Sequence, residues 1–327
     1  MSRLDGARVL VVGGAGLIGS YVVEELTREP VDEIVVYDNF TRGTRENLAA
    51  AMEDPRVRVF EEGDDILHTD LLREAVEGTD FVVHLAALWL MHCHEFPRSA
   101  FHVNVEGTFN VLEACRDAGV EKLVYSSSAS VYGDAVEVPM TEEHPYNNRT
   151  FYGATKIAGE HMARAFHDRY GLDYVALRYM NVYGPRQDYK GTYIAVMMKI
   201  LDRIDEGKPP VIHGDGSQTY DFVYVRDVAR ANVRALKSDA TDLFCNVGTG
   251  EGTTIAELTD LLLQITGSDL EPEHREADRE FVTNRIGSVE TAREELGFEA
   301  EVELEEGLRR LVEWRNTRPD TGTHEVR

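Results

Sequence analysis

Tyr152 and Lys156 are the residues whose types and spacing most directly indicate chemistry. The segment 151–170 repeats apolar or small residues at helical spacing, so the two side chains should stack one turn apart on one helix face. A nearby ammonium favours a phenolate, and we expect it to lower the pKa of Tyr152 from its usual value of about 10. Such a tyrosine could exchange a proton with a sugar hydroxyl or carbonyl. A solvated helix face is the alternative, because this spacing is common by chance.

A row of hydroxyls lies upstream of that pair. The stretch KLVYSSSASVYG, residues 122–133, passes from an apolar, strand-like run into three consecutive serines that end at Ser128. Ala129 and Ser130 follow, and neither carries a carboxylate. The stretch therefore places hydroxyl groups, but no acid, at the end of a buried strand.

A glycine-rich turn near the N-terminus is the third candidate. Residues 13–19 read GGAGLIG and lie directly between a strand-like and a helix-like segment. Such a turn lets a pyrophosphate approach the backbone and the free N–H groups of the helix. Asp38 ends the next strand-like run, where an acid accepts hydrogen bonds from a ribose 2′-hydroxyl and repels a 2′-phosphate. The pattern predicts a dinucleotide site that favours NAD over NADP, although Arg42 and Arg45 could serve a 2′-phosphate.

Composition limits the classes of function. The 327 residues carry a net charge of −25, which argues against binding the phosphate backbone of nucleic acids. No apolar stretch is long enough to span a membrane, and the first residues lack the apolar segment of an export signal. Cys93, Cys115 and Cys245 are far apart, as expected in the reducing cytoplasm. His92 and His94 flank Cys93 too closely to converge on one ion, so we expect no metal.

Alternating short apolar runs and helix-like segments must position these residues. The runs are rich in valine and continuously apolar, as in strands that are buried on both faces. The pattern predicts an α/β fold with a Rossmann-like, doubly wound parallel sheet. The predicted strands are 8–12, 33–37, 57–60, 81–85, 122–126 and 174–178. The predicted helices include 17–27, 71–77, 100–118, 151–170 and 302–315.

After Asn181 the chain becomes rich in turn residues, which indicates a second, smaller α/β lobe that binds substrate. We expect the dinucleotide-binding domain to span residues 1–180, with 219–249 returning to it. The lobe would comprise residues 181–218 and 250–315, with the charged stretch 271–280 as a loop, and 316–327 as a flexible tail.

Together these motifs resemble the extended short-chain dehydrogenase/reductase family, in its branch of NAD-dependent nucleotide-sugar epimerases and dehydratases. The resemblance covers about residues 7–315 and is carried by GGAGLIGS, VVYDNF, GDDI, HLAAL, NVEGT, SSSASVYG, YGATK, LRYMNVYGPRQ and DFVYVRDVA. It implies that Ser128, Tyr152 and Lys156 are catalytic and that NAD is the cofactor. The residues that it places around NAD are Gly13, Gly16, Leu17, Ile18, Gly19, Asp38, Asn39, Arg42, Asp65, Ile66, Leu85, Ala86, Ala87, Asn104, Tyr152, Lys156 and Tyr179.

The resemblance also discriminates between reactions. Dehydratases of this branch follow the catalytic hydroxyl with an Asp-Glu pair, and the decarboxylases keep a glutamate, whereas here Ala129 and Ser130 stand there. The pattern is closest to UDP-sugar 4-epimerases, which are isomerases. We predict transient oxidation at C4 of a UDP-hexose, UDP-N-acetylhexosamine or UDP-uronic acid, rotation of the 4-keto sugar and return of the hydride. An NAD(P)H-dependent 4-keto-sugar reductase is the alternative, ahead of a 4,6-dehydratase or a cofactor sensor without turnover.

Substrate contacts follow from the same resemblance, which implies carbohydrate metabolism such as polysaccharide biosynthesis, and a homodimer through segments 100–118 and 152–170. The implied substrate residues are Ser128, Tyr152, Asn181, Arg186, Tyr220 and Arg275, with Arg279 as a further candidate. Tyr220 stands where the family usually has an arginine that contacts the diphosphate, and tyrosine carries no charge. Leu88–Met91 is bulky where family members often contact the sugar, so the sugar stays open.

Overall fold

A parallel seven-stranded sheet forms the centre of the computed structural model, which describes residues 3–60, 65–187, 196–276 and 284–317. The strand order is β11-β6-β5-β4-β1-β2-β3, so the chain reverses direction across the sheet between β1 and β4. This is the predicted doubly wound sheet. Its strands are β1 (Arg8–Val12), β2 (Glu33–Tyr37), β3 (Val57–Val59), β4 (Phe81–His84), β5 (Lys122–Ser128), β6 (Asp173–Tyr179) and β11 (Leu243–Val247).

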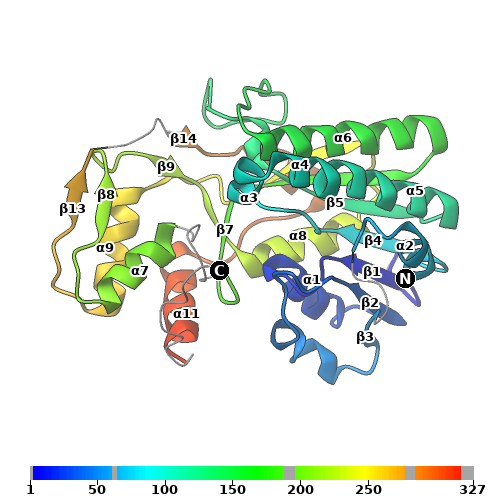
Figure 1. The fold of residues 1–327 in the computed structure, drawn as a ribbon, viewed down its shortest axis with the longest axis horizontal. Helices are drawn as coiled ribbons and strands as arrows, with labels where there is room; N and C mark the ends of the chain where they lie inside the picture. The colour runs from blue at the N-terminus through cyan, green and yellow to red at the C-terminus, as the bar shows by residue number, and fades with distance from the viewer. Residues whose placement is uncertain (1–2, 61–64, 188–195, 277–283, 318–327) are drawn as a thin grey trace.

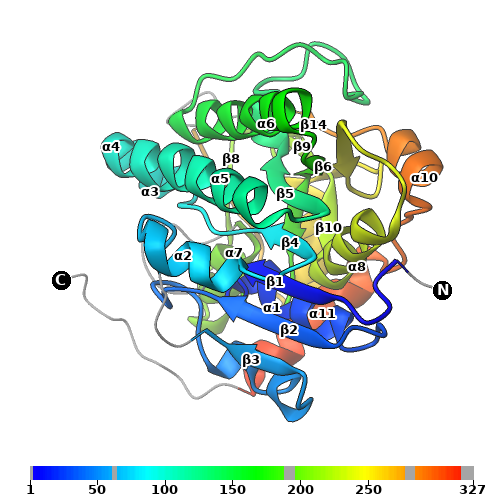
Figure 2. The ribbon, with the colours of Figure 1, turned by 90° about the vertical axis from the view of Figure 1, so that its right-hand side faces the viewer.

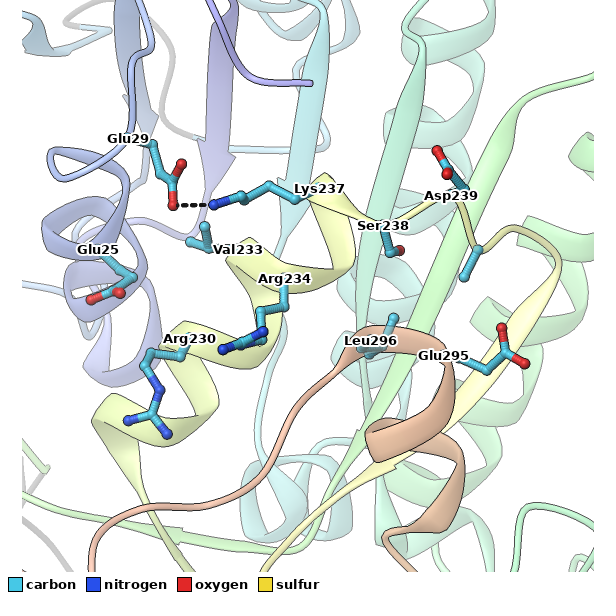
Figure 3. A pocket seen from close by; sticks show the side chains of 11 residues that line it. Glu25, Glu29, Arg230, Val233, Arg234, Lys237, Ser238, Asp239, Glu295 and Leu296 are labelled. Atoms are coloured by element: carbon cyan, nitrogen blue, oxygen red, sulfur yellow. Dashed lines mark hydrogen bonds and ion pairs between the residues drawn. The ribbon is translucent and has the colours of Figure 1, made fainter. Parts of the chain in front are cut away.

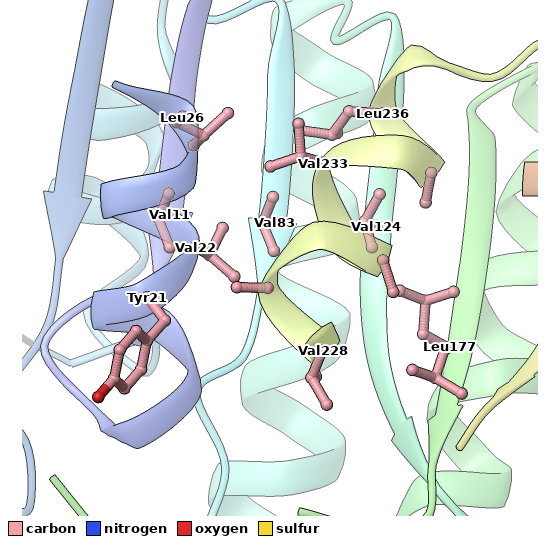
Figure 4. Packing of buried hydrophobic residues seen from close by; sticks show 14 of the residues in the cluster. Val11, Tyr21, Val22, Leu26, Val83, Val124, Leu177, Val228, Val233 and Leu236 are labelled. Atoms are coloured by element: carbon pink, nitrogen blue, oxygen red, sulfur yellow. The ribbon is translucent and has the colours of Figure 1, made fainter. Parts of the chain in front are cut away.

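Helices cover both faces of the sheet (Figure 2). One face carries α1 (Leu17–Leu26) and α8 (Val225–Lys237), and the other carries α2 (Thr69–Val76), α5 (Thr108–Ala118) and α6 (Phe151–Tyr170). Alternate strand residues divide between two cores. Val11, Val83 and Val124 pack against α1 and α8 (Figure 4), whereas Leu10 and Leu123 face the other helices. Burial on both faces explains the continuous apolar runs in the sequence.

A smaller lobe lies beside the sheet (Figure 1). Its own apolar core joins helices and short strands through residues such as Met198, Leu258 and Leu311. The elements after β6 that are not in the main sheet or α8 are β7 (Asn181–Tyr183), α7 (Val196–Asp205), β8 (Val211–His213), β9 (Thr219–Tyr220), β10 (Phe222–Tyr224), β12 (Thr253–Thr254), α9 (Ile255–Thr266), β13 (Glu273–Arg275), β14 (Asn284–Arg285), α10 (Glu290–Leu296) and α11 (Leu304–Asn316). The prediction of a loop over 271–280 was wrong in part, because β13 pairs with β8. The predicted tail lies almost entirely outside the described residues.

The predicted helix 100–118 is also not one regular α-helix. Its first part is α4 (Pro97–Ala100), followed by a π-helical segment, η3 (Phe101–Gly107), before α5 begins. Gly107 packs so closely on Ile66 that a Cβ there would lie 2.4 Å from its side chain. Such π-helical turns frequently occur at functional sites. The remaining short elements are η1 (Glu46–Leu48), η2 (Ala51–Glu53), α3 (Leu90–Glu95) and η4 (Ala129–Val131).

Within the described ranges, no helix combines the length and apolarity that a membrane crossing requires.

Candidate active site

The predicted site residues meet at the carboxyl edge of the sheet. Asp38 follows β2, Leu85 follows β4, and Ser128 and Tyr179 end the neighbouring strands β5 and β6. Ser128 and Tyr179 are directly paired in register. In open α/β sheets, ligands bind outside the carboxyl ends of the strands where the strand order reverses, and here that point lies between β1 and β4.

Gly16 is the glycine of this turn that has free space beside its Cα atom. A Cβ at Gly13, whose φ is +84°, would lie 2.6 Å from Ala86 N, and one at Gly19 would lie 2.1 Å from Gly13 O. Both glycines therefore permit close packing within the protein. At Gly16, by contrast, the nearest atom to a Cβ would be Gly13 O, at 3.5 Å. Half-buried Gly16 thus has free space beside it just before the N-terminus of α1, and Leu17 and Ile18 begin that helix.

Asp38 holds this turn in place. Its Oδ2 accepts a hydrogen bond from Ala15 N at 2.9 Å, and its Oδ1 accepts one from Phe40 N at 2.8 Å. Burial raises the pKa of the carboxyl, while these two N–H groups act against the rise. Each carboxylate oxygen has two lone pairs, so the side chain retains the capacity to accept further bonds from a ribose.

The segments after β2 and β3 meet beside Asp38. Asn39 Nδ2 donates to Asp65 Oδ2 at 3.3 Å, and the Tyr37 hydroxyl donates to Asp65 O at 2.9 Å. Ile66 is buried, and its carbonyl accepts a hydrogen bond from Asn110. The structure therefore brings Asn39, Asp65 and Ile66 together, as the adenine end of a dinucleotide site would require.

Asn104 fixes the loop after β4. Its Oδ1 accepts from Leu88 N at 2.7 Å, and its Nδ2 donates to Leu88 O at 3.0 Å and to Thr155 Oγ1, on α6, at 3.2 Å. The preceding residues Leu85 and Ala86 donate their N–H groups to Val12 O, and Ala87 follows them. One amide side chain thus links this loop to the helix that carries Tyr152.

A contact between Arg42 and Trp89 joins the loops after β2 and β4. The Arg42 guanidinium carbon lies 3.5 Å from the centre of the Trp89 ring. A guanidinium over an aromatic face is attracted by the ring quadrupole. No sequence pattern pairs these residues, because 47 positions separate them.

The three predicted catalytic residues converge. Lys156 Nζ donates to Ser126 O at 2.6 Å and lies 5.7 Å from the centre of the Tyr152 ring. The Ser128 hydroxyl lies within hydrogen-bonding reach of the Tyr152 phenol and accepts a hydrogen bond from Ser130 N at 3.1 Å. The end of strand β5 and the first turn of helix α6 therefore place the hydroxyl groups of Ser128 and Tyr152 close together.

The expected pKa of Tyr152 was wrong for the protein without ligand. Burial raises the pKa of Tyr152 to about 12, against the opposing effects of Ser128 and Arg285. Burial also lowers the pKa of Lys156 to about 8. The desolvation of the phenol outweighs the neighbouring positive charge, and the Lys156 ammonium points at the Ser126 carbonyl.

A buried ion pair lies behind the catalytic face of α6. The Arg178 guanidinium donates to both carboxylate oxygens of Glu160 at 2.8 Å, and neither side chain is more than 1% exposed. Ser127 and Tyr146 donate to the same carboxylate. Sequence reasoning missed this group, although Glu160 follows Lys156 by one helical turn. Together with the Ser127 bond, the ion pair ties α6 to β5 and β6 close to the predicted catalytic residues.

A cavity of about 610 Å³ lies in the smaller lobe and contains three of the predicted substrate residues. Asn181, Tyr220 and Arg275 line it together with apolar side chains such as Phe222 and Ile255. Arg275 is exposed and hydrogen-bonds Glu273 through Nε at 3.0 Å and Nη2 at 2.9 Å.

Arg186 is placed elsewhere. Its Nη1 donates to Ser20 Oγ at 3.1 Å, its Nη2 pairs with Glu24, and its guanidinium lies over the Tyr21 ring, all on α1. These contacts do not support the prediction that Arg186 binds substrate, because its charge is already paired within the protein. Arg279 lies outside the described residues. Tyr179 is buried, and its hydroxyl donates to Asn232 Oδ1 at 2.9 Å.

Comparison with known proteins places this geometry in a family. The family model described as NAD dependent epimerase/dehydratase family matches residues 9–248. The chain belongs to this family. A relative from Methanocaldococcus jannaschii, named putative UDP-glucose 4-epimerase, is 37% identical over 309 residues, which cover 94% of this chain and 97% of the relative.

Solved structures agree with that assignment. The UDP-N-acetylglucosamine 4-epimerase from Methanobrevibacter ruminantium is 32% identical with a TM-score of 0.89, and the match covers 96% of this chain and 99% of that one. The UDP-glucose 4-epimerase from Thermotoga maritima is 36% identical with a TM-score of 0.86, and the match covers 94% and 98% of the two chains. The similarity spans both the sheet and the smaller lobe.

The site fits the NAD on which this family depends. The open backbone at Gly16 can receive a pyrophosphate, which a side chain at that position would obstruct. Asp38, with its remaining lone pairs, lies where the adenosine ribose of a bound dinucleotide would be.

A second cavity, of about 640 Å³, lies away from these residues (Figure 3). It is lined by acidic and basic side chains of α1, α8 and α10, including Glu25, Arg234 and Glu295. It extends to Ser238, where α8 ends beside Lys122, the first residue of β5. This cavity therefore lies at the edge of the sheet opposite to the one that carries Ser128, Tyr152 and Lys156.

Proposed function

We propose that this chain is an NAD-dependent nucleotide-sugar 4-epimerase acting on a UDP-sugar. The observation that supports the reaction best is the meeting of Ser128, Tyr152 and Lys156 beside a segment without a carboxylate. Ala129 and Ser130 follow Ser128 in η4, and both are buried. Elimination or decarboxylation would need an acid or base there, whereas epimerisation needs only hydride and proton transfer.

The proposed mechanism assigns one task to each catalytic residue. NAD supplies, when bound, the acceptor and donor of the hydride at sugar C4. Tyr152 takes the O4 proton as C4 is oxidised and returns it after the sugar has rotated. Ser128 hydrogen-bonds O4 and stabilises the charge that develops there. Lys156, anchored on Ser126 O, supplies positive charge near the phenolate and a donor for the nicotinamide ribose.

We propose that the nucleotide part of the substrate occupies the cavity of the smaller lobe. Asn181, Tyr220 and Arg275 line that cavity, and its apolar walls suit a planar base. Glucose, N-acetylglucosamine and glucuronic acid are the sugars to compare. The named relatives act on UDP-glucose and UDP-N-acetylglucosamine, which favours a UDP-linked sugar here.

The domain boundaries, location and oligomeric state are further parts of the proposal. Residues 1–180 with 219–249 would form the dinucleotide-binding domain, and 181–218 with 250–315 the substrate lobe. Cys93, Cys115 and Cys245 are free and buried, which suits the cytoplasm. A homodimer would pack α5 and α6 of one protomer against those of its partner, and the sugar would serve polysaccharide biosynthesis.

The test is incubation of the purified protein with UDP-, dTDP-, GDP- and CDP-sugars without added NADH. We expect a C4 epimer to form with no net change in the absorbance of reduced nicotinamide. Turnover only with added NAD(P)H would overturn the proposal in favour of a 4-keto-sugar reductase. Tyr152→Phe should lower kcat by about 10²- to 10⁴-fold, as expected for loss of a general acid–base. Tyr170→Phe, at the exposed end of α6, is the matched control.

A further inference from the structure

Arg285 lies beside Tyr220 on the neighbouring strand of the smaller lobe. Strands β9 and β14 are parallel, and Tyr220 and Arg285 are partners in register. Side chains of paired residues lie on the same face of a sheet. Tyr220 lines the cavity of the lobe, so Arg285 lies directly beside a residue of the cavity wall.

The Arg285 side chain is half-buried, whereas its Nε atom is fully enclosed. Within the described part of the chain, its Nε atom is buried and has no hydrogen-bond partner. Arg178, by comparison, is held by both oxygens of Glu160, and Arg186 by Glu24. A buried charge is costly unless an opposite charge or hydrogen-bond acceptors compensate for it. Arg285 is therefore suited to receive an acceptor from outside the protein.

The surroundings of Arg285 connect the cavity with the catalytic residues. Its charge interacts with Tyr220, Asp134 and Tyr152. Both tyrosines are neutral at pH 7, because burial raises the pKa of each above its usual value. The cation is thus close enough to the cavity-lining Tyr220, to the acid Asp134 and to the Tyr152 phenol to interact with all three.

We propose that Arg285 binds an oxyanion of the substrate and supplies, from the adjacent strand, the positive charge that Tyr220 does not carry. This inference rests on the proposed function, since it assumes a substrate that reaches from Tyr152 into the cavity. The group that Arg285 binds is a phosphate or carboxylate oxygen. It could come from the diphosphate of any nucleotide sugar or from the C6 carboxylate of a uronic acid.

The test measures binding to the NAD-loaded protein by calorimetry with UDP, UDP-glucose and UDP-glucuronate. We expect Arg285→Gln to raise the Kd by about 10- to 100-fold, the range for loss of hydrogen bonds to a charged group. An equal loss for all three ligands identifies the diphosphate as the source. A loss confined to UDP-glucuronate identifies the carboxylate. Changes below about twofold for all three would overturn the proposal.

Two further variants separate binding from folding. Arg293→Gln removes an exposed arginine of α10 that pairs with Glu299, and it should leave every Kd unchanged. The double variant Tyr220→Arg/Arg285→Gln moves the charge by one strand and should restore most of the affinity for UDP. If Arg285→Gln does not fold, Arg285→Lys replaces it. That variant keeps the charge but not the fork of donors, so we expect a smaller rise in Kd, and an unchanged affinity would overturn the role of the guanidinium.

The two proposals fail in different ways. UDP binding needs no epimerisation, so a fall in UDP affinity in Arg285→Gln supports the oxyanion site even if no sugar is epimerised. Epimerisation with unchanged Kd values in Arg285→Gln would retain the function and overturn the role of Arg285.

Discussion

At the residue scale, burial and charge act on Tyr152 in opposite directions. The phenol is enclosed, which raises its pKa to about 12, although Ser128 and Arg285 favour the phenolate. The Lys156 ammonium is itself weakened by burial, and its pKa falls to about 8. Burial therefore disfavours the charged form of both groups, and the phenolate gains less from the lysine than it would in a solvent-exposed pair.

Removal of NAD should therefore raise the pKa of Tyr152. The oxidised nicotinamide ring is positively charged, and a cation beside the phenol favours its ionised form. We expect the phenolate to appear at lower pH in the NAD-loaded protein than in the NAD-free protein. Ultraviolet difference spectra between the wild type and Tyr152→Phe, recorded across pH, measure this ionisation. Identical titrations with and without NAD would contradict the expectation.

At the scale of secondary-structure elements, two features position the catalytic groups. The turn before α1 is closed on itself at Gly13 and Gly19 and open at Gly16. Helix α6 is tied to β5 and β6 through the Glu160–Arg178 pair. The first feature determines where a pyrophosphate can approach, and the second determines where Tyr152 and Lys156 lie relative to Ser128.

Gly16→Val should abolish tight NAD binding with little effect on stability. The φ of Gly16 is −72°, which valine can adopt, and a Cβ there has room within the protein. The branched side chain would instead fill the space for the pyrophosphate. We expect the Kd for NAD to rise by roughly tenfold or more, measured by calorimetry. Gly13→Ala is the contrast, because its φ of +84° and its contact with Ala86 predict a loss of folding stability.

Glu160→Gln should destabilise the fold by about 3–5 kcal/mol, the usual cost of breaking a buried ion pair. The substitution leaves the Arg178 guanidinium buried beside a neutral amide. Urea unfolding of the NAD-free protein measures the change. Glu306→Gln, in the exposed pair with Arg310 on α11, is the control and should cost less than about 1 kcal/mol. Equal effects of the two variants would show that the buried pair adds no more than the exposed one.

At the scale of the whole molecule, the outer surface of η3, α5 and α6 is unusually aromatic. Phe101, Phe109, Phe151 and Tyr170 are each more than 40% exposed there. The rings of Phe109 and Tyr170 both contact Phe166, which links the two helices. Exposed apolar side chains can mark sites of protein association, and those on η3, α5 and α6 support the proposed packing of helices across a homodimer.

Phe109→Glu should convert the proposed dimer into a monomer. A carboxylate on this surface would be desolvated on association, which is strongly unfavourable. Light scattering coupled to size-exclusion chromatography gives the molar mass of each variant. Met52→Glu is the control, since Met52 is also exposed but lies in η2, far along the chain from α5 and α6. A wild type that is already monomeric would contradict the dimer.

Strands β1 and β2 and helix α6 show how far local sequence patterns reach. The ends of β1, β2 and α6 coincide with the predicted ones, because buried strands and caps leave strong local signals. No local signal in the segment 100–118 marked the π-helical η3, in which Gly107 packs against the distant Ile66. Arg186 was assigned to the substrate from its position in a motif, but in the fold its charge pairs with Glu24.

The sequence alone determined the family resemblance and, through it, the predictions of an NAD site and of Ser128, Tyr152 and Lys156 as catalytic residues. These follow from short motifs whose spacing fixes their geometry on one strand, turn or helix. Only the tertiary structure decided the pKa of Tyr152 and the partnership of Tyr220 with Arg285. Burial and strand pairing arise from segments that are far apart in the chain, and 65 positions separate those two residues. Local spacing therefore identifies the reactive residues, whereas the electrostatic environment of these residues depends on the whole fold.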